Sequence, residues 1–102
     1  MVREIEDHIV ALEAICRRFQ VRRLELFGSA VGETFNQESS DLDFIVEFDD
    51  KPAAGYADAY FGLAEALKDL FHRDVDLVVL SAVKNPYFRE SIEQSRTLLY
   101  AA

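Results

Sequence analysis

The stretch "LFGSAVGETFNQESSDLDFIV", residues 26–46, joins two apolar, strand-like segments through a small-residue corner and a polar loop. In residues 41–48, "DLDFIVEF", apolar side chains alternate as in a strand with one buried face. Asp41 and Asp43 therefore project from the same face of this strand, roughly 6–7 Å apart. Two carboxylates this close repel unless a cation compensates them, so the stretch predicts a cation site. From spacing alone, a turn-capping role for these aspartates stays open.

Alternating helix and strand patterns extend from this stretch in both directions. Residues 3–19 carry apolar side chains at spacings of 4, 3, 4 and 3, and residues 56–71 repeat these spacings, which predicts two helices with one apolar stripe each. A third helix is predicted to open at Asn85, an N-cap residue followed by Pro86. Strands are predicted over residues 22–27, 41–48, 74–80 and 97–100. The order predicts an α/β-like domain, residues 1–102, with a central sheet covered by helices.

The helical stripes identify the side chains expected in the core. They are Ile5, Ile9, Leu12, Cys16 and Phe19 in the first helix, Tyr56, Tyr60, Leu63, Leu67 and Leu70 in the second, and Phe88 and Ile92 in the third. Polar residues outside the stripes are expected at the surface, among them His8 and His72. Three arginines that flank strands could contact a phosphate but are expected to be solvated charges: Arg22, Arg23 and Arg73. The two histidines have no spacing typical of metal ligands. A tyrosine of the second helix could alternatively stack on a base.

Charge and composition limit the classes of function. The net charge of −8 argues against nonspecific nucleic-acid binding, which needs a basic surface. It leaves two roles open for the acidic residues: they hold cations, or they face a basic protein partner. The single cysteine excludes an internal disulfide and multi-cysteine metal sites. Since no apolar run approaches the ~20 residues of a membrane span and the start lacks a signal-peptide pattern, we expect a cytoplasmic protein.

A third carboxylate lies in "RDVDLVVL", residues 73–80. Asp76 interrupts an apolar strand and faces away from the side of that strand expected in the core. If this strand neighbours residues 41–48, Asp76 completes a cluster of three carboxylates. Such a cluster can hold two metal ions ~3.5–4 Å apart at a phosphoryl group. Asp74, on the same face, is the nearest alternative and is expected to be a solvated residue at the strand edge.

The corner of the opening stretch completes the pattern. Gly28 and Ser29 directly follow a strand, where backbone N–H groups and a hydroxyl can meet a phosphate. The common nucleotide-binding loops, GxxxxGK[ST] and GxGxxG, are absent from the sequence. Gly-Ser, a spacer, Asp-x-Asp on the next strand and a third acid on a later strand resemble the polymerase-β-type nucleotidyltransferase superfamily. The flanks "LFGSA" and "SSDLDFIVEF" resemble its small branch, the minimal nucleotidyltransferases (MNT).

The resemblance implies a fold, a reaction and a set of ligands. The fold is α+β, a mixed central sheet flanked by helices. Asp41, Asp43 and Asp76 would be the catalytic acids and would bind Mg²⁺, with two ions expected, while Gly28 and Ser29 would hold the β- and γ-phosphates of ATP. The reaction would transfer a nucleoside monophosphate, expected to be AMP, to an acceptor hydroxyl and release pyrophosphate. Positioning and charge neutralisation supply most of such catalysis.

The resemblance also suggests a partner and an alternative. Members of the MNT branch resemble antitoxins that pair with small helical HEPN-type RNases, and some transfer AMP to a tyrosine of that partner. Here Ala30 and Val31 follow Gly-Ser where many relatives have a basic residue, and the spacer is one residue longer. The alternative is therefore a protein-binding antitoxin that neutralises its partner stoichiometrically through a vestigial site. The sequence leaves homo-oligomerisation, the acceptor and the preferred nucleotide open.

Overall fold

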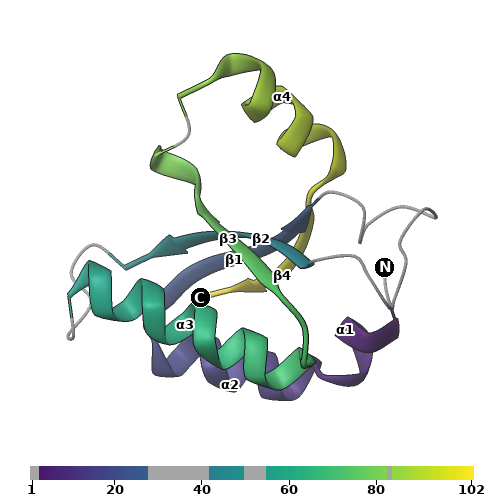
Figure 1. The fold of residues 1–102 in the computed structure, drawn as a ribbon, viewed down its shortest axis with the longest axis vertical. Helices are drawn as coiled ribbons and strands as arrows, with labels where there is room; N and C mark the ends of the chain where they lie inside the picture. The colour runs from purple at the N-terminus through teal and green to yellow at the C-terminus, as the bar shows by residue number, and fades with distance from the viewer. Residues whose placement is uncertain (1–2, 28–41, 50–54, 83) are drawn as a thin grey trace.

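A mixed sheet of four strands in the order β3-β2-β1-β4 forms the centre of the fold (Figure 1). The computed structural model describes residues 3–27, 42–49, 55–82 and 84–102. The strands are β1 (Val21–Phe27), β2 (Leu42–Phe48), β3 (Val75–Val79) and β4 (Thr97–Ala101). β2 and β3 run parallel, whereas β1 is antiparallel to both β2 and β4. This arrangement confirms the expected α+β architecture.

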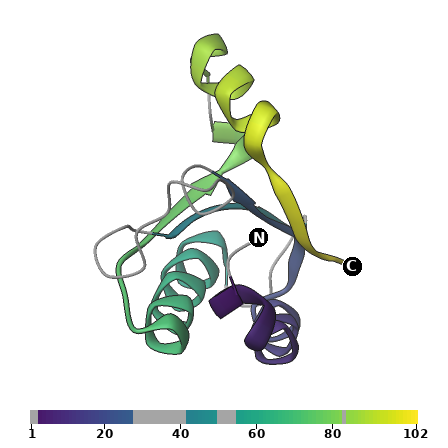
Figure 2. The same cartoon turned by 90° about the vertical axis from the view of Figure 1, so that its right-hand side faces the viewer.

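Three helices cover one face of the sheet (Figure 2). They are α1 (Arg3–Asp7), α2 (Ile9–Arg18) and α3 (Tyr56–Phe71). The prediction of one continuous helix over residues 3–19 is wrong, because the helix is interrupted at His8. The Nδ1 atom of His8 lies 2.8 Å from the carbonyl oxygen of Glu4, the group to which the backbone N–H of His8 would donate in a continuous helix. That N–H donates to Ile5 instead, at 3.1 Å.

The core lies between this helical layer and the facing side of the sheet. The strand β2 contributes its apolar face to this core, because every second residue of the strand, from Leu42 to Phe48, is buried on that face. Cys16 is fully buried, as its place in the helical stripe predicted. In α3 the predicted stripe is only partly correct, since Tyr56 at the first turn is 57% exposed. The buried residues of α3 are Ala59, Leu63, Leu67 and Phe71.

Two of the residues expected at the surface are partly buried. His8 is half-buried and meets the ring of Phe71 edge-on, with ring centroids 5.7 Å apart. The side chain of Arg73 is 16% exposed and forms a 2.9 Å ion pair with Glu4, so it is not a fully solvated charge. His72 is exposed, as expected, and ends α3 in a left-handed conformation with φ of 54°.

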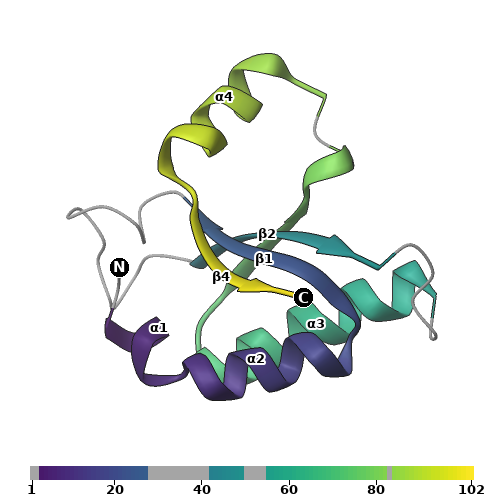
Figure 3. The same cartoon turned by 180° about the vertical axis from the view of Figure 1, so that it is seen from behind.

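The connection between β3 and β4 projects from the other face of the sheet. It contains a short 3₁₀ helix, Leu80–Ala82, and α4 (Pro86–Ser95), and it stands away from the layer of α2 and α3 (Figures 1 and 2). The expected N-cap is confirmed, because the Asn85 side chain accepts hydrogen bonds from the first two N–H groups after Pro86, at 2.9 and 3.2 Å. Seen from behind, α4 leads directly into β4, which lies alongside β1 (Figure 3).

The position of α4 corrects one expected core contact. Phe88 was expected in the core but is 42% exposed, because α4 does not join the main helical layer. Its ring instead meets Phe27 edge-on at 6.2 Å, beside a small apolar cluster of Phe27, Ile45 and Val78 on the open face of the sheet. The side chain of Ile92 lies outside the described residues. None of the described helices is long and apolar enough to cross a membrane.

Candidate active site

The open face of the sheet brings two of the predicted acids together. In the parallel pairing of β2 with β3, Asp43 lies directly opposite Asp76. Neighbouring strands are about 4.8 Å apart, and both side chains are on the same face as the apolar pair Ile45 and Val78. Asp43 is half-buried and Asp76 is exposed. The strands are thus neighbours, which was the condition for Asp76 to approach the Asp-x-Asp segment.

Between the two candidates on the later strand, the structure distinguishes Asp76 from Asp74. Asp74 precedes β3, its side chain is 75% exposed, and it forms an ion pair with Lys68 at 3.5 Å. It is the solvated residue at the strand edge that the sequence suggested. Only Asp76 has Asp43 as its partner in the strand register.

The other predicted site residues are Gly28, Ser29 and Asp41, and they lie outside the described residues. The described residue that precedes Gly28 in the chain shows which part of the sheet this segment leaves. Phe27, the last residue of β1, lies opposite Asp43 in the antiparallel pairing. Asp76, Asp43 and Phe27 therefore form one row across three strands, which we call the carboxylate row.

A cavity of about 400 Å³ opens at the carboxylate row. Its lining consists of Phe27, Asp43, Tyr60, Val75, Asp76, Leu77, Val78 and Phe88. The two acids thus share a cavity with the Phe27–Phe88 ring pair. One wall of the cavity can hold cations while the other is apolar, a combination that suits a charged ligand with a planar or aliphatic part.

The paired acids suit a hard divalent cation. Carboxylate oxygens are the ligands that Mg²⁺ prefers, and Mg²⁺ is usually bound by one or two carboxylates together with substrate phosphates. Two carboxylates on adjacent strands repel each other, and a cation between them removes that repulsion. Within the described ranges no group of three or more acidic, histidine or cysteine side chains could hold a metal, and the acids that the register brings together there are the pair Asp43 and Asp76.

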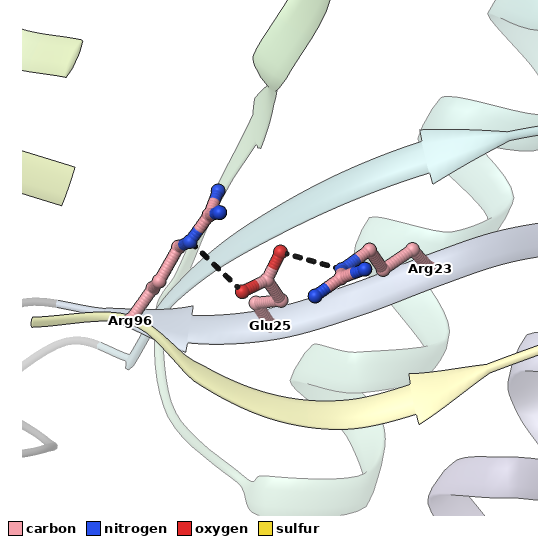
Figure 4. Close-up of polar contacts among 3 residues, drawn as sticks. All are labelled: Arg23, Glu25 and Arg96. Carbon is pink, nitrogen blue, oxygen red and sulfur yellow. Dashed lines mark hydrogen bonds and ion pairs between the residues drawn. The ribbon is translucent and has the colours of Figure 1, made fainter. Parts of the chain in front are cut away.

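A buried charge that the sequence did not single out lies next to this row. Glu25 on β1 is 3% exposed and lies opposite Ile45, on the open face. Arg23 donates a hydrogen bond from Nε to its Oε1 at 2.9 Å, and the Nε of Arg96 lies 3.4 Å from its Oε2 (Figure 4). In the sequence, Glu25 simply alternates with leucines in "RRLELF" and looks like a solvated strand residue. Arg23, two residues earlier on the same strand face, was the one residue of this strand that could have indicated a paired charge at Glu25.

A second cavity, of about 550 Å³, lies at the other end of β2 and β3. Tyr56 and Tyr60 of α3 contribute to its lining, together with Arg22 and Glu47. The hydroxyl of Tyr60 donates to the backbone oxygen of Leu77 at 2.6 Å, so this side chain fixes α3 to the edge strand of the sheet. This contact supports the predicted packing role of Tyr60.

Cys16 can be set aside as a nucleophile. Burial raises the pKa of its thiol to about 12, the nearby Glu13 carboxylate adds to the increase, and Arg17 opposes it. The thiolate is the reactive form, so this cysteine is inert near neutral pH.

Comparison with known proteins identifies the family. Residues 9–99 match the nucleotidyltransferase domain family, a span that includes β1, β2 and β3 and therefore the carboxylate row. The chain belongs to this family. The resemblance inferred from the Gly-Ser and Asp-x-Asp motifs is thereby confirmed, and the chain is a nucleotidyltransferase.

Individual relatives agree with the family match. The nucleotidyltransferase is 36% identical over 94 residues to MJ0128 of Methanocaldococcus jannaschii, a candidate protein adenylyltransferase, covering 91% of this chain and 92% of that relative. A solved candidate minimal nucleotidyltransferase superposes with a TM-score of 0.73 at 26% identity, covering 91% of this chain and 90% of that one. A chain from a toxin–antitoxin crystal structure with AMP-PNP superposes with a TM-score of 0.70 at 25% identity, covering 95% and 73%.

Proposed function

We propose that this nucleotidyltransferase transfers AMP from ATP to a hydroxyl group of a partner protein. The acceptor oxygen would form a bond to the α-phosphorus, the bond from that phosphorus to the bridging oxygen of the β-phosphate would break, and the acceptor would lose its proton. Pyrophosphate would leave with the bridging oxygen. Asp41, Asp43 and Asp76 would be the catalytic acids, and Gly28 and Ser29 would hold the β- and γ-phosphates.

The observation that carries the proposal is the register that places Asp43 beside Asp76. In a member of the nucleotidyltransferase family, two acids on adjacent strands at the mouth of a cavity suit Mg²⁺ and a triphosphate. When bound, Mg²⁺ would neutralise the charge of the triphosphate. The protein's own contribution would be to hold the two carboxylates in place, with Asp76 also oriented to accept the proton of the acceptor hydroxyl.

The partner we propose is a small helical HEPN-type toxin, which makes this chain an antitoxin. The motif resembles the MNT branch, and the fold is shared with a chain of a toxin–antitoxin complex that contains AMP-PNP. The net charge of −8 favours association with a basic surface. The acceptor would thus arrive on a second protein chain.

The test is transfer of label from ATP, labelled on its α-phosphate, to a purified HEPN-type partner in the presence of Mg²⁺. We expect Asp43→Asn and Asp76→Asn to lower the rate at least about a hundredfold, because metal-assisted charge stabilisation contributes several kcal/mol. Asp74→Asn is the matched control, since it removes a neighbouring carboxylate outside the carboxylate row, and it should retain the wild-type rate. Absence of transfer by wild type, or equal rates for wild type and Asp43→Asn, would refute the proposal.

The alternative function, stoichiometric neutralisation, rests on Ala30 and Val31, which stand where many relatives have a basic residue. The same variants distinguish the two functions. A folded Asp43→Asn/Asp76→Asn double variant that neutralises the toxin as fully as wild type favours simple binding. Loss of neutralisation, with complex formation retained, favours enzymatic modification.

A further inference from the structure

Arg96 enters the sheet at the end where the carboxylate row lies. The first residue of β4, Thr97, is opposite Leu26, and the strands are antiparallel. Arg96 therefore comes alongside Phe27, the member of the carboxylate row on β1. The row on the open face thus runs from Asp76 through Asp43 and Phe27 to Arg96.

The ion pair with Glu25 directs the Arg96 side chain over β1. Its Nε lies 3.4 Å from Oε2 of Glu25, and Figure 4 shows the side chain reaching from the start of β4 over β1, on the face that carries Glu25. The side chain remains 32% exposed. Within the described part of the chain, Glu25 is the one ion-pair partner of Arg96, and the contact uses Nε. The two Nη groups of the guanidinium remain as donors, and a guanidinium fork matches a phosphate well.

Glu25 has two cationic neighbours. Arg23 donates a 2.9 Å hydrogen bond to Glu25 and lies opposite Glu47 in the strand register, so two carboxylates surround Arg23. Arg96 is the other cation, and it lies at the end of this group nearer to the carboxylate row. A cation beside a row of carboxylates suits an anion that bridges the row and the cation, as a metal-bound triphosphate would.

We propose that Arg96 contacts the β- and γ-phosphates of the nucleoside triphosphate, held in place by Glu25. This inference rests on the proposed function. Ala30 and Val31 follow Gly-Ser in this chain, where many relatives have a basic residue. Arg96 supplies the cation from the opposite end of the sequence, and its place beside Phe27 sets it next to the strand end from which Gly28 and Ser29 continue. Glu25 is a positioning residue that acts through Arg96.

The competing explanation is that Arg96 only neutralises Glu25 and fixes the junction of α4 and β4. Arg23→Gln is the matched control, because it removes the other cation of the same carboxylate. Arg23 lies opposite Glu47, four residues before Phe27, the member of the carboxylate row on β1. A purely structural role predicts similar effects for Arg23→Gln and Arg96→Gln, whereas a phosphate contact predicts an effect of Arg96→Gln alone.

The experiment measures binding of AMP-PNP and of AMP by calorimetry, in Mg²⁺, to the full chain. We expect Arg96→Gln to weaken the binding of AMP-PNP about tenfold to a hundredfold, which is the effect of one lost charged hydrogen bond. The affinity of this variant for AMP should stay within about twofold of that of wild type. Arg23→Gln should leave both ligands within about threefold of wild type. Arg96→Lys, which keeps a cation for Glu25, should fold like wild type and bind AMP-PNP more tightly than Arg96→Gln.

Three results would overturn the inference. They are unchanged AMP-PNP binding by Arg96→Gln, an equal loss for AMP and AMP-PNP, and an equal loss in Arg23→Gln. Each of these leaves the proposed function intact, provided that wild type binds AMP-PNP. A wild-type protein that binds no AMP-PNP overturns both the proposed function and the role of Arg96.

Discussion

Replacing Arg23 and Arg96 singly and together should reveal that they compensate one buried carboxylate. Either single replacement with glutamine leaves the other arginine paired with Glu25. Arg23 donates a 2.9 Å hydrogen bond to Glu25, whereas Arg96 forms a 3.4 Å ion pair with it. A lost hydrogen bond to a buried charge costs about 1.5–3 kcal/mol, and we expect the longer ion pair to cost no more than this. The arginine side chains are 44% and 32% exposed, so solvent screening lowers the expected cost to about 1 kcal/mol for each single variant.

The double variant should lose much more than the sum of the single variants. The Glu25 side chain is 4% exposed, and it would retain no cationic partner among the described residues. Leaving an unpaired buried charge costs about 3–5 kcal/mol. The expected coupling free energy between Arg23 and Arg96 is therefore about 1–3 kcal/mol, and the midpoint temperature of the double variant should fall by more than about 10 °C.

Urea denaturation, monitored by far-ultraviolet circular dichroism, gives the free energies of unfolding of wild type, the two single variants and the double variant. Circular dichroism is used because the chain has no tryptophan to report by fluorescence. Arg17→Gln is the control: its ion pair with Glu13 is long, at 4.0 Å, and exposed, so this variant should lose less than about 0.5 kcal/mol. If the losses of unfolding free energy in the Arg23 and Arg96 variants are additive within about 0.5 kcal/mol, the two arginines do not jointly compensate the buried charge of Glu25.

Three further predictions follow from single contacts. Because burial raises the pKa of Cys16 from its ordinary 9.0 to about 12, the unfolded chain loses the thiol proton first, so the stability advantage of wild type over Cys16→Ala should shrink between pH 9 and 12 in urea titrations. Tyr60→Phe removes the hydrogen bond to Leu77 and should cost about 1 kcal/mol, while Tyr87→Phe, at an 83% exposed position, should cost almost nothing. Asn85→Ala should lose about 1 kcal/mol of stability in the same assay, and Asn85→Asp, which keeps an acceptor for the first turn of α4, should lose little.

The features predicted correctly from the sequence are those that depend on neighbouring residues. The alternation in residues 41–48 gave both the strand and its buried face, and the helix over residues 56–71 has the predicted bounds. The cap at Asn85 was equally predictable, because its hydrogen bonds join residues two and three apart. Such patterns follow from the periods of the helix and strand.

The features that the sequence did not predict depend on contacts between distant parts of the chain. Phe88 has the apolar character of a core residue, and only the placement of α4 on the open face explains its exposure. Glu25 lies between two leucines, and one of the two cations beside its buried carboxylate, Arg96, comes from a distant part of the sequence. The interruption at His8 is the local exception: its side chain competes for the backbone carbonyl of Glu4, four residues earlier, and the apolar periodicity does not reveal this contact.

The candidate site is intermediate between these cases. The residue types and spacing identified Asp43 and Asp76 as partners only on the condition that their strands are neighbours. The sequence could not supply the register, because it depends on how α3 returns the chain to the sheet. The structure supplies it, with Asp43 opposite Asp76.

The parallel register of β2 and β3 has a consequence for the evolution of this chain. α3 has 16 residues, a length of about 24 Å, and its packing on the core fixes where β3 begins. Sliding β3 by one residue would turn Asp76 toward the core and away from Asp43. Substitutions on the exposed side of α3 should therefore be tolerated, whereas insertions and deletions in it should be eliminated. Length variation among relatives, and the insertion of an engineered tag, should be accepted more readily at the exposed Lys84, which precedes the Asn85 cap of α4.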